Sequence, residues 1–133
     1  NLHKKMFCDV WVWAGEYRIT ERNIGVAPYQ IPMKLMQLFD DLNFWIDNKT
    51  YSNHEIAVRL HHKLVQIHPF PNGNGRVSRL MADLVLQKLE GKTLYWGDTN
   101  LVDVSEVRRK YIDALRKADA GDYTDLLNFT MKK

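Results

Sequence analysis

The sequence is poor in cysteine: Cys8 stands alone among 133 residues. One thiol cannot close a disulfide within the chain, which favours a fold held by packing and a reducing, cytoplasmic setting. No apolar run approaches the roughly 18 residues of a membrane-spanning helix, and the N-terminus lacks a signal-peptide layout. We therefore expect neither a disulfide scaffold nor a membrane protein.

A long basic run is also missing. Nineteen Lys and Arg face sixteen Asp and Glu, which gives a net charge of +3, and the two signs are mixed along the chain. Without a concentrated positive stripe, nothing in the sequence supports a nucleic-acid partner. The length suits a single core, so we expect one domain over residues 1–133. Because the chain begins at Asn1 without Met, we expect that domain to be truncated at its N-terminus.

The sequence also lacks a zinc motif. Four histidines invite the hypothesis, but no pair is four residues apart and no H-E-x-x-H occurs. The four are His54, His61, His62 and His68.

Apolar periodicity predicts an all-α protein of about six helices. Gly15 ends the first pattern, Pro32 suits a helix start, and Ser52 with Glu55 forms a capping-box pattern. Residues 17–31 have no helical period, and the alternation around Gly25 suggests a short β-hairpin or an extended loop. The predicted helices cover residues 2–14, 32–48, 52–68, 74–90, 104–118 and 123–131.

Residues 68–76, with the sequence HPFPNGNGR, separate two strongly apolar helical patterns. Pro69 ends the first helix, and two glycines let backbone amides approach a ligand closely. The next helix starts at once, so its free N–H groups favour an anion. Arg76 and Arg79 share one face of that helix. The predicted ligand of this loop is a phosphate group, bound beside His68.

This stretch resembles the signature of Fic domains, His-x-Phe-x-[Asp/Glu]-Gly-Asn-[Gly/Lys]-Arg, with a second arginine three residues later. The matching residues are His68, Phe70, Gly73, Asn74, Gly75, Arg76 and Arg79. Residues 6–18 look like the family's early helix, and Asn23, Ile24 and Gly25 look like its flap. The resemblance implies a compact Fic-type helical bundle with a short β-hairpin flap.

The resemblance also implies a reaction. In Fic enzymes the matching histidine, here His68, takes a proton from a hydroxyl of a target protein, and the hydroxyl attacks the α-phosphate of ATP. A Ser, Thr or Tyr of the target would then carry AMP, and pyrophosphate would leave.

The resemblance gives the remaining residues their roles. Phe70 would pack beneath the loop, and the flap, completed by Val26, would hold the target peptide as an added strand. Arg76 would bind the β- and γ-phosphates as a second catalytic residue. Arg79 would bind the γ-phosphate, and Gly73, Asn74 and Gly75 would cradle phosphate oxygens.

Asn72 departs from the pattern. Fic domains have a carboxylate there that ligates Mg²⁺ on the phosphates, whereas Asn72 offers only a neutral carbonyl oxygen. Alternatives therefore stay open: a nucleotide-binding or regulatory module with weak catalysis, or a different phosphate transfer. Phosphoryl-transferring relatives have Lys where this chain has Gly75, which argues against that version.

Many Fic proteins carry an inhibitory helix with the pattern [Ser/Thr]-x-x-x-Glu-[Gly/Asn]. No Ser or Thr in this sequence has Glu four residues later. We expect that the chain does not inhibit itself, and that any inhibitor lies upstream of Asn1 or on a separate protein such as an antitoxin.

Overall fold

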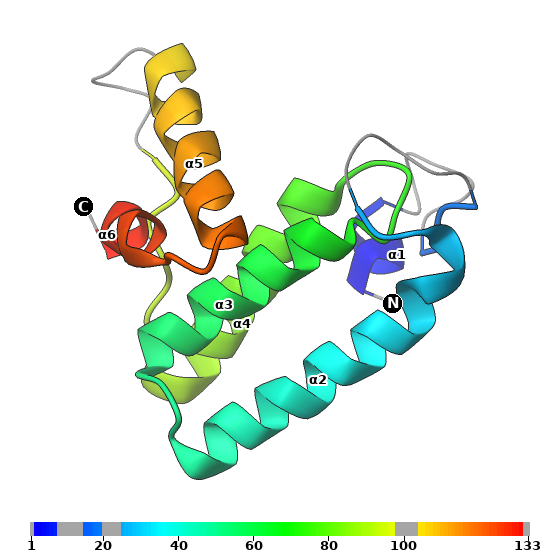
Figure 1. The fold of residues 1–133 in the computed structure, drawn as a ribbon. Coiled ribbons are helices and arrows are strands. Elements are labelled where there is room, and N and C mark those ends of the chain that lie inside the picture. Colours follow the sequence, from blue (N-terminus) through cyan, green and yellow to red (C-terminus); the bar gives the residue numbers. More distant parts are fainter. Residues whose placement is uncertain (1, 8–14, 20–24, 98–103, 132–133) are drawn as a thin grey trace.

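The computed structural model describes residues 2–7, 15–19, 25–97 and 104–131. These residues form helices joined by turns and coil, with no strand among them, so the all-α prediction is confirmed (Figure 1). The elements are α1 (Leu2–Phe7), the 3₁₀ turn η1 (Pro28–Gln30), α2 (Ile31–Asn48), α3 (Asn53–Ile67), α4 (Asn74–Glu90), α5 (Val104–Asp119) and α6 (Thr124–Met131).

Local signals in the sequence set the helix ends. Ser52 Oγ accepts the backbone N–H of Glu55 at 3.1 Å and caps α3, as predicted. The Glu55 carboxylate pairs with Arg59 Nε at 2.8 Å, so only half of the predicted capping box forms. Lys49 (φ 50°) and Gly91 (φ 69°) end α2 and α4 in the left-handed conformation, confirming both stops.

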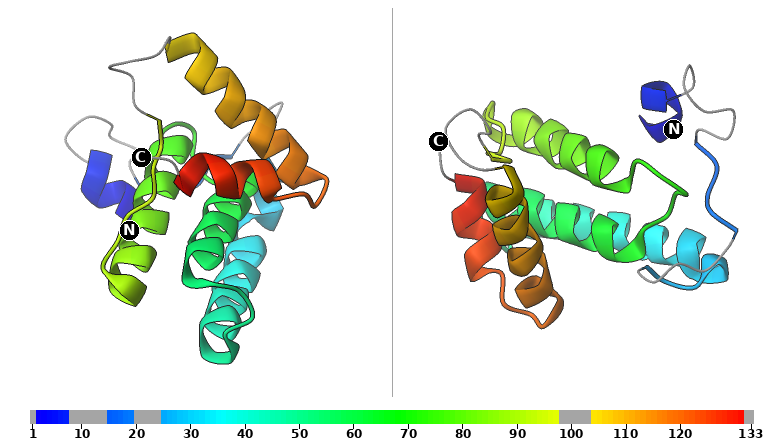
Figure 2. Two further views of the ribbon diagram at one scale, coloured as in Figure 1. Left: turned by 90° about the vertical axis from the view of Figure 1, so that its left-hand side faces the viewer. Right: turned by 90° about the horizontal axis from the view of Figure 1, so that it is seen from above.

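Helices α3 and α4 lie side by side as an antiparallel pair, and α2 packs along α3 on its other flank (Figures 1 and 2). Helices α5 and α6 cover the end of this pair where α3 begins, and α1 lies near the start of α4. Helix α3 contributes to two buried clusters and is therefore the central helix of the described fold. One joins α2 to α3 (Ile31, Leu35, Leu38, Leu60, Leu64, Ile67), and the other joins α3, α4, α5 and α6 (Ala57, Val58, Ala82, Leu86, Leu94, Ala114, Ala118, Tyr123, Leu126).

The predicted β-hairpin flap is not supported. Asn23 and Ile24 lie outside the described residues, and Gly25 and Val26 are in coil rather than in a strand. The Val26 N–H donates to the Ile67 carbonyl at 3.3 Å, so this backbone pairs with the end of α3. The last carbonyls of a helix have no partner within it, and they attract such donors.

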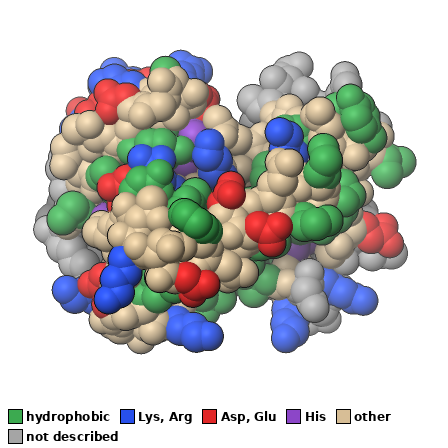
Figure 3. Space-filling view, turned by 60° about the horizontal axis from the view of Figure 1, so that its bottom comes forward, with side chains coloured by type: hydrophobic (Ala, Val, Ile, Leu, Met, Phe, Trp, Pro, Cys, Tyr) green, Lys and Arg blue, Asp and Glu red, His purple; other side chains and the backbone are tan. Residues whose placement is uncertain are grey.

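The surface carries both charge signs. On the face shown in Figure 3, Lys and Arg side chains alternate with Asp and Glu side chains, and exposed hydrophobic side chains lie between them. Exposed hydrophobics of η1 and α2 include Tyr29, Met33, Met36 and Phe44. Within the described ranges, no helix is both long and apolar enough to span a bilayer.

Candidate active site

The loop between α3 and α4 begins with a residue in an unusual conformation. His68 caps α3 with φ 51° and ψ 60°, and its N–H donates to the Leu64 carbonyl at 3.0 Å. A residue with a Cβ adopts this left-handed conformation at a cost of about 1 kcal/mol, so neighbouring contacts must fix it.

Arg18 supplies those contacts. Its side chain is buried, with a relative exposure of 2%, and donates to the carbonyls of His68 (2.5 Å), Ile67 (3.1 Å) and Val26. Its backbone N–H donates to the Pro69 carbonyl at 2.9 Å. A guanidinium at a helix C-terminus also complements the negative end of the helix dipole. Arg18 therefore holds the backbone on both sides of the His68 side chain.

Gly25 packs directly against this junction. Its φ is +99°, and a Cβ built there would lie 2.6 Å from Arg18 Nη2 and 2.7 Å from His68 Cβ. Only glycine fits, because both the conformation and the space exclude a side chain. Gly25 therefore brings the predicted flap segment onto the histidine.

His3, on α1, contacts the middle of the loop. Its ring stacks on Phe70 (centroids 3.8 Å apart), and Nε2 lies 2.8 Å from the Asn72 carbonyl. Because Nδ1 accepts the Gly15 N–H at 2.9 Å, Nε2 carries the proton and donates it to Asn72. Burial lowers the pKa of His3, opposed by the bond to the Asn72 carbonyl. The Phe70 ring is buried.

Asn74 closes the loop at the start of α4. It is buried, its Oδ1 accepts the Phe70 N–H at 2.9 Å, and its Nδ2 donates to the Phe70 carbonyl at 2.7 Å. The amide side chain of Asn74 thus satisfies both backbone hydrogen-bonding groups of Phe70. Gly73 precedes the helix with φ 79° and offers no side-chain acceptor to the first N–H groups. Asn72 itself has an exposed side chain.

The two motif arginines lie on the first turns of α4. Arg76 is exposed and Arg79 is half-buried. The Arg79 side chain folds back toward the loop, since a Cβ on Gly75 would lie 3.2 Å from Arg79 Nη1. Gly75 therefore leaves room for Arg79 beside the helix N-terminus. The structure thus gathers a positive group and a helix N-terminus next to the loop that begins at His68.

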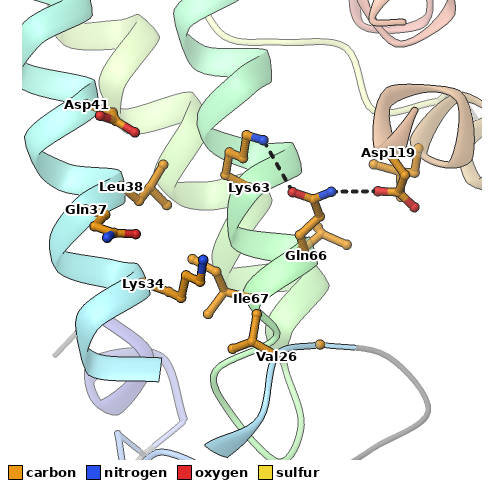
Figure 4. A pocket seen from close by; sticks show the side chains of 12 residues that line it. Val26, Lys34, Gln37, Leu38, Asp41, Lys63, Gln66, Ile67 and Asp119 are labelled. Carbon is orange, nitrogen blue, oxygen red and sulfur yellow. Dashed lines mark hydrogen bonds between the residues drawn. The ribbon is translucent and has the colours of Figure 1, made fainter. Parts of the chain in front are cut away.

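A hollow of about 570 Å³, lined by both polar and apolar residues, adjoins the other side of the α3 C-terminus. Figure 4 shows Lys34, Gln37, Leu38 and Asp41 of α2 facing α3 across it. On its α5 side, Lys63 donates to Gln66 at 3.5 Å, and Gln66 donates to Asp119 at 3.2 Å. Gly25, Val26 and Ile67 also line it, so the hollow is continuous with the flap segment.

The donor atoms of the described residues do not build a magnesium or zinc site by themselves. No three His, Cys, Asp or Glu side chains in this part of the chain lie close enough to hold a metal ion. In the loop, the Asn72 backbone carbonyl already accepts from His3. Its amide oxygen offers one neutral ligand, whereas Mg²⁺ in nucleotide sites is ordinarily bound through carboxylates and phosphates.

Sequence reasoning missed His3 and Arg18 as parts of the site. Both are buried polar residues, and each is far from residues 68–76 in the chain. The signal for Arg18 was its place within the stretch that resembled the family. His3 gave no signal, because one histidine in an amphipathic pattern does not reveal a stacking partner.

The fold and this site define a class: an all-helical protein whose central helix pair is joined by a loop that begins with a histidine and leads into a helix N-terminus. Comparisons identify the family. The model of the Fic/DOC family matches residues 1–86, and the chain belongs to that family.

Its relatives include proteins named protein adenylyltransferase Fic. That of Aedes aegypti is 31% identical over 97% of this chain and 25% of its own length, and that of Drosophila willistoni is 35% identical with the same coverage. Among solved structures, Fic-1 of Caenorhabditis elegans (aa134–508 E274G) has a TM-score of 0.78 at 27% identity and covers 96% of this chain and 37% of that chain. The chain spans about a quarter of the length of these curated relatives.

Proposed function

We propose that this chain is a protein adenylyltransferase domain that transfers AMP from ATP to a Ser, Thr or Tyr hydroxyl of a target protein. The observation that carries the proposal is His68, fixed in the left-handed conformation by Arg18 and followed within six residues by the N-terminus of α4. The names of the relatives support the choice of AMP as the transferred group.

The reaction is a displacement at phosphorus. The target hydroxyl oxygen forms a bond to the α-phosphorus of ATP, His68 takes the hydroxyl proton, and the bond to the departing pyrophosphate breaks. General-base assistance of this kind typically contributes about 10²–10⁴-fold. The charge on the phosphates is met by Arg76, Arg79 and the amides of Gly73, Asn74 and Gly75.

The structure supports different roles for the residues proposed to bind the phosphates. Asn74 uses its side chain on Phe70, so its contribution to a phosphate is through the backbone and through the shape of the loop. Arg76 is exposed, and its role in this proposal is to bind the β- and γ-phosphates. If Mg²⁺ takes part, it arrives with the nucleotide and is held mainly by phosphate oxygens, with Asn72 as its one neutral candidate ligand.

The flap segment is the proposed docking place for the target. Gly25 and Val26 lie against His68 and Ile67, so a peptide following Asn23, Ile24, Gly25 and Val26 would pass the histidine. An extended backbone there would pair through main-chain hydrogen bonds. An inhibitory partner, such as an antitoxin, would act by occupying Arg79 or this segment.

The second candidate is a nucleotide-binding or regulatory module with weak transfer, and Asn72 is the observation that favours it. A missing unit charge about 4 Å from another is worth at most about 4 kcal/mol at an effective dielectric of about 20, which is enough to weaken metal binding greatly.

One experiment separates the candidates. The parent and His68→Ala are incubated with target proteins and labelled nucleoside triphosphates, products are identified by mass spectrometry, and ATP binding is measured by calorimetry. We expect the parent to transfer AMP and His68→Ala to have lost this activity. Both proteins should bind ATP with the same affinity.

The matched control is His54→Ala, because His54 lies at the opposite end of α3 and contacts Thr130 at 2.9 Å. Full transfer by His68→Ala refutes the mechanism. ATP binding without transfer by the parent supports the regulatory module, and a phosphoryl product identifies a different transferase.

A further inference from the structure

His3 binds one peptide group of the loop between α3 and α4. Its Nε2 donates to the Asn72 carbonyl at 2.8 Å, although the two residues are 69 positions apart in the chain. His3 is only 1% exposed, and its ring stacks on Phe70 with 3.8 Å between the centroids and 14° between the planes. Burial and stacking therefore fix the donor of this hydrogen bond, which reaches the loop from α1.

Gly15 determines which nitrogen of His3 carries the proton. The Gly15 N–H donates to Nδ1 at 2.9 Å, so Nδ1 is the acceptor of the neutral ring and Nε2 is its donor. Burial lowers the pKa of His3; the bond to the Asn72 carbonyl opposes this effect, and the positive charge of Arg76 adds to it. The ring is therefore neutral at pH 7, with its one N–H directed at Asn72.

This hydrogen bond determines how the peptide group between Asn72 and Gly73 is oriented. The described peptide bonds are all trans, and in a trans peptide the C=O and the N–H point in opposite directions. Because the Asn72 carbonyl is directed at His3, the Gly73 N–H is directed away from His3. The hydrogen bonds of the described residues give this N–H no acceptor. It remains a donor for a ligand at the start of α4.

The loop does not fix this orientation through its own side chains. Gly73 has φ 79° and ψ 11°, and glycine adopts positive and negative φ about equally readily. The peptide that precedes Gly73 could therefore turn over with little steric resistance from residue 73. The side chain of Asn74 binds the backbone of Phe70 instead. Among the described contacts, the side chain that selects one orientation of this peptide is that of His3.

We propose that His3 is a positioning residue that turns the Gly73 N–H toward a phosphate of the bound nucleotide, by holding the Asn72 carbonyl on the opposite side of the same peptide. This inference rests on the proposed function, in which Gly73 binds a phosphate oxygen. His3 touches no reacting atom and acts through the peptide. An N–H that is already oriented when the nucleotide arrives needs no rotation at that moment, so it contributes more to binding than the N–H of a peptide that is free to turn.

Two substitutions separate the hydrogen bond of His3 from the packing of its ring. His3→Phe keeps a ring against Phe70 but cannot donate to Asn72, whereas His3→Gln keeps an N–H donor and lacks the ring. Calorimetry measures ATP affinity, urea unfolding measures stability, and NMR follows the chemical shift of the Gly73 amide as ATP is added. We expect His3→Phe to bind ATP at least about fivefold more weakly and to lose the ATP-induced shift of the Gly73 amide, because the hydrogen bond from that amide to phosphate is weakened. His3→Gln should recover most of the affinity and of the shift.

The matched control is His54→Phe, because His54 is also a partly buried histidine and its Nε2 lies 2.9 Å from Thr130 Oγ1, at the opposite end of α3. This variant should keep the ATP affinity and the Gly73 shift of the parent. Weaker ATP binding by His3→Gln than by His3→Phe overturns the inference, because the packing of the ring would then be what matters. Equal losses of affinity in both variants that follow their losses of stability also overturn it, since His3 would then serve the whole fold.

The same measurements separate this inference from the proposed function. If the parent binds ATP and His3→Phe equals it in affinity or in the Gly73 shift, the inference fails and the proposed function stands. If the parent does not bind ATP, the proposed function itself fails.

Discussion

Replacing Arg18 with Met should unfold the loop between α3 and α4 before it disturbs the rest of the fold. Met keeps much of the apolar stem but removes the donors to the carbonyls of His68, Ile67 and Val26. The Ile67 carbonyl keeps the Val26 N–H, but the other two carbonyls lose their Arg18 donor, and each buried carbonyl left without a donor costs about 1–3 kcal/mol. The variant no longer has to bury a guanidinium, which offsets part of that loss. The net destabilisation should be roughly 2 kcal/mol, a measurable part of a total stability of about 5–15 kcal/mol.

Urea unfolding of the parent and the variant measures this loss, and the transfer assay at a temperature where both are folded measures its effect on chemistry. Because the left-handed conformation of His68 is held by Arg18, transfer should fall at least about tenfold in protein that remains folded. Arg59→Met is the control: Arg59 pairs with Glu55 at 2.8 Å and lies over the rings of Tyr51 and Tyr123, but it is partly exposed. Its loss should cost about 1 kcal/mol or less, with transfer intact. An Arg18→Met protein as stable and as active as Arg59→Met would refute the reasoning.

Three further predictions use other contacts of the site. Gly25→Ala should reduce transfer at least about tenfold, because its Cβ would meet Arg18 and His68; Gly121→Ala, with a similar φ of +94° and open space, should show only the backbone cost of about 1–2 kcal/mol. Burial lowers the pKa of His61 from 6.5 to about 3, so between those pH values the unfolded chain binds the extra proton. Urea unfolding should therefore show stability falling as pH drops below 6.5, by about 2 kcal/mol from this group at pH 5, and His61→Gln should lack that part of the slope. Asn72→Asp should increase the dependence of transfer on Mg²⁺; an unchanged magnesium titration contradicts the assignment of Asn72 to the metal position.

The helices were predictable because their signals are local. Ser52, Lys49 and Gly91 act on the turn next to them, and the apolar period of residues 56–67 needs only one buried face. The flap was not predictable in the same way. The alternation around Gly25 suggested a strand, but the described backbone there pairs with the C-terminal carbonyls of α3, a partner some forty residues away.

The candidate site shows the same difference. The loop between residues 68 and 74 could be predicted from residue order alone, because a helix end, two glycines and a helix start follow one another; its binding of an anion stays a prediction. The side chains that hold this loop could not be predicted in this way. His3 and Arg18 reach it from α1 and from the segment after Gly15. Their positions depend on tertiary packing, and a histidine or arginine in such a sequence context gives no sign of its burial.

This division explains why the change at Asn72 can be tested cleanly. The loop uses only the backbone carbonyl of Asn72, which accepts from His3, while its side chain is exposed. The neighbouring Asn74 is the residue whose amide closes the loop. A carboxylate at position 72 therefore changes the charge offered to a nucleotide without removing a described contact of the fold. Substitutions at position 74 alter the loop itself, so Asn74→Ala should lose stability as well as transfer, whereas Asn72→Asp should alter metal dependence at constant stability. We thus predict that Asn72 affects the chemistry of this loop and that Asn74 maintains its structure.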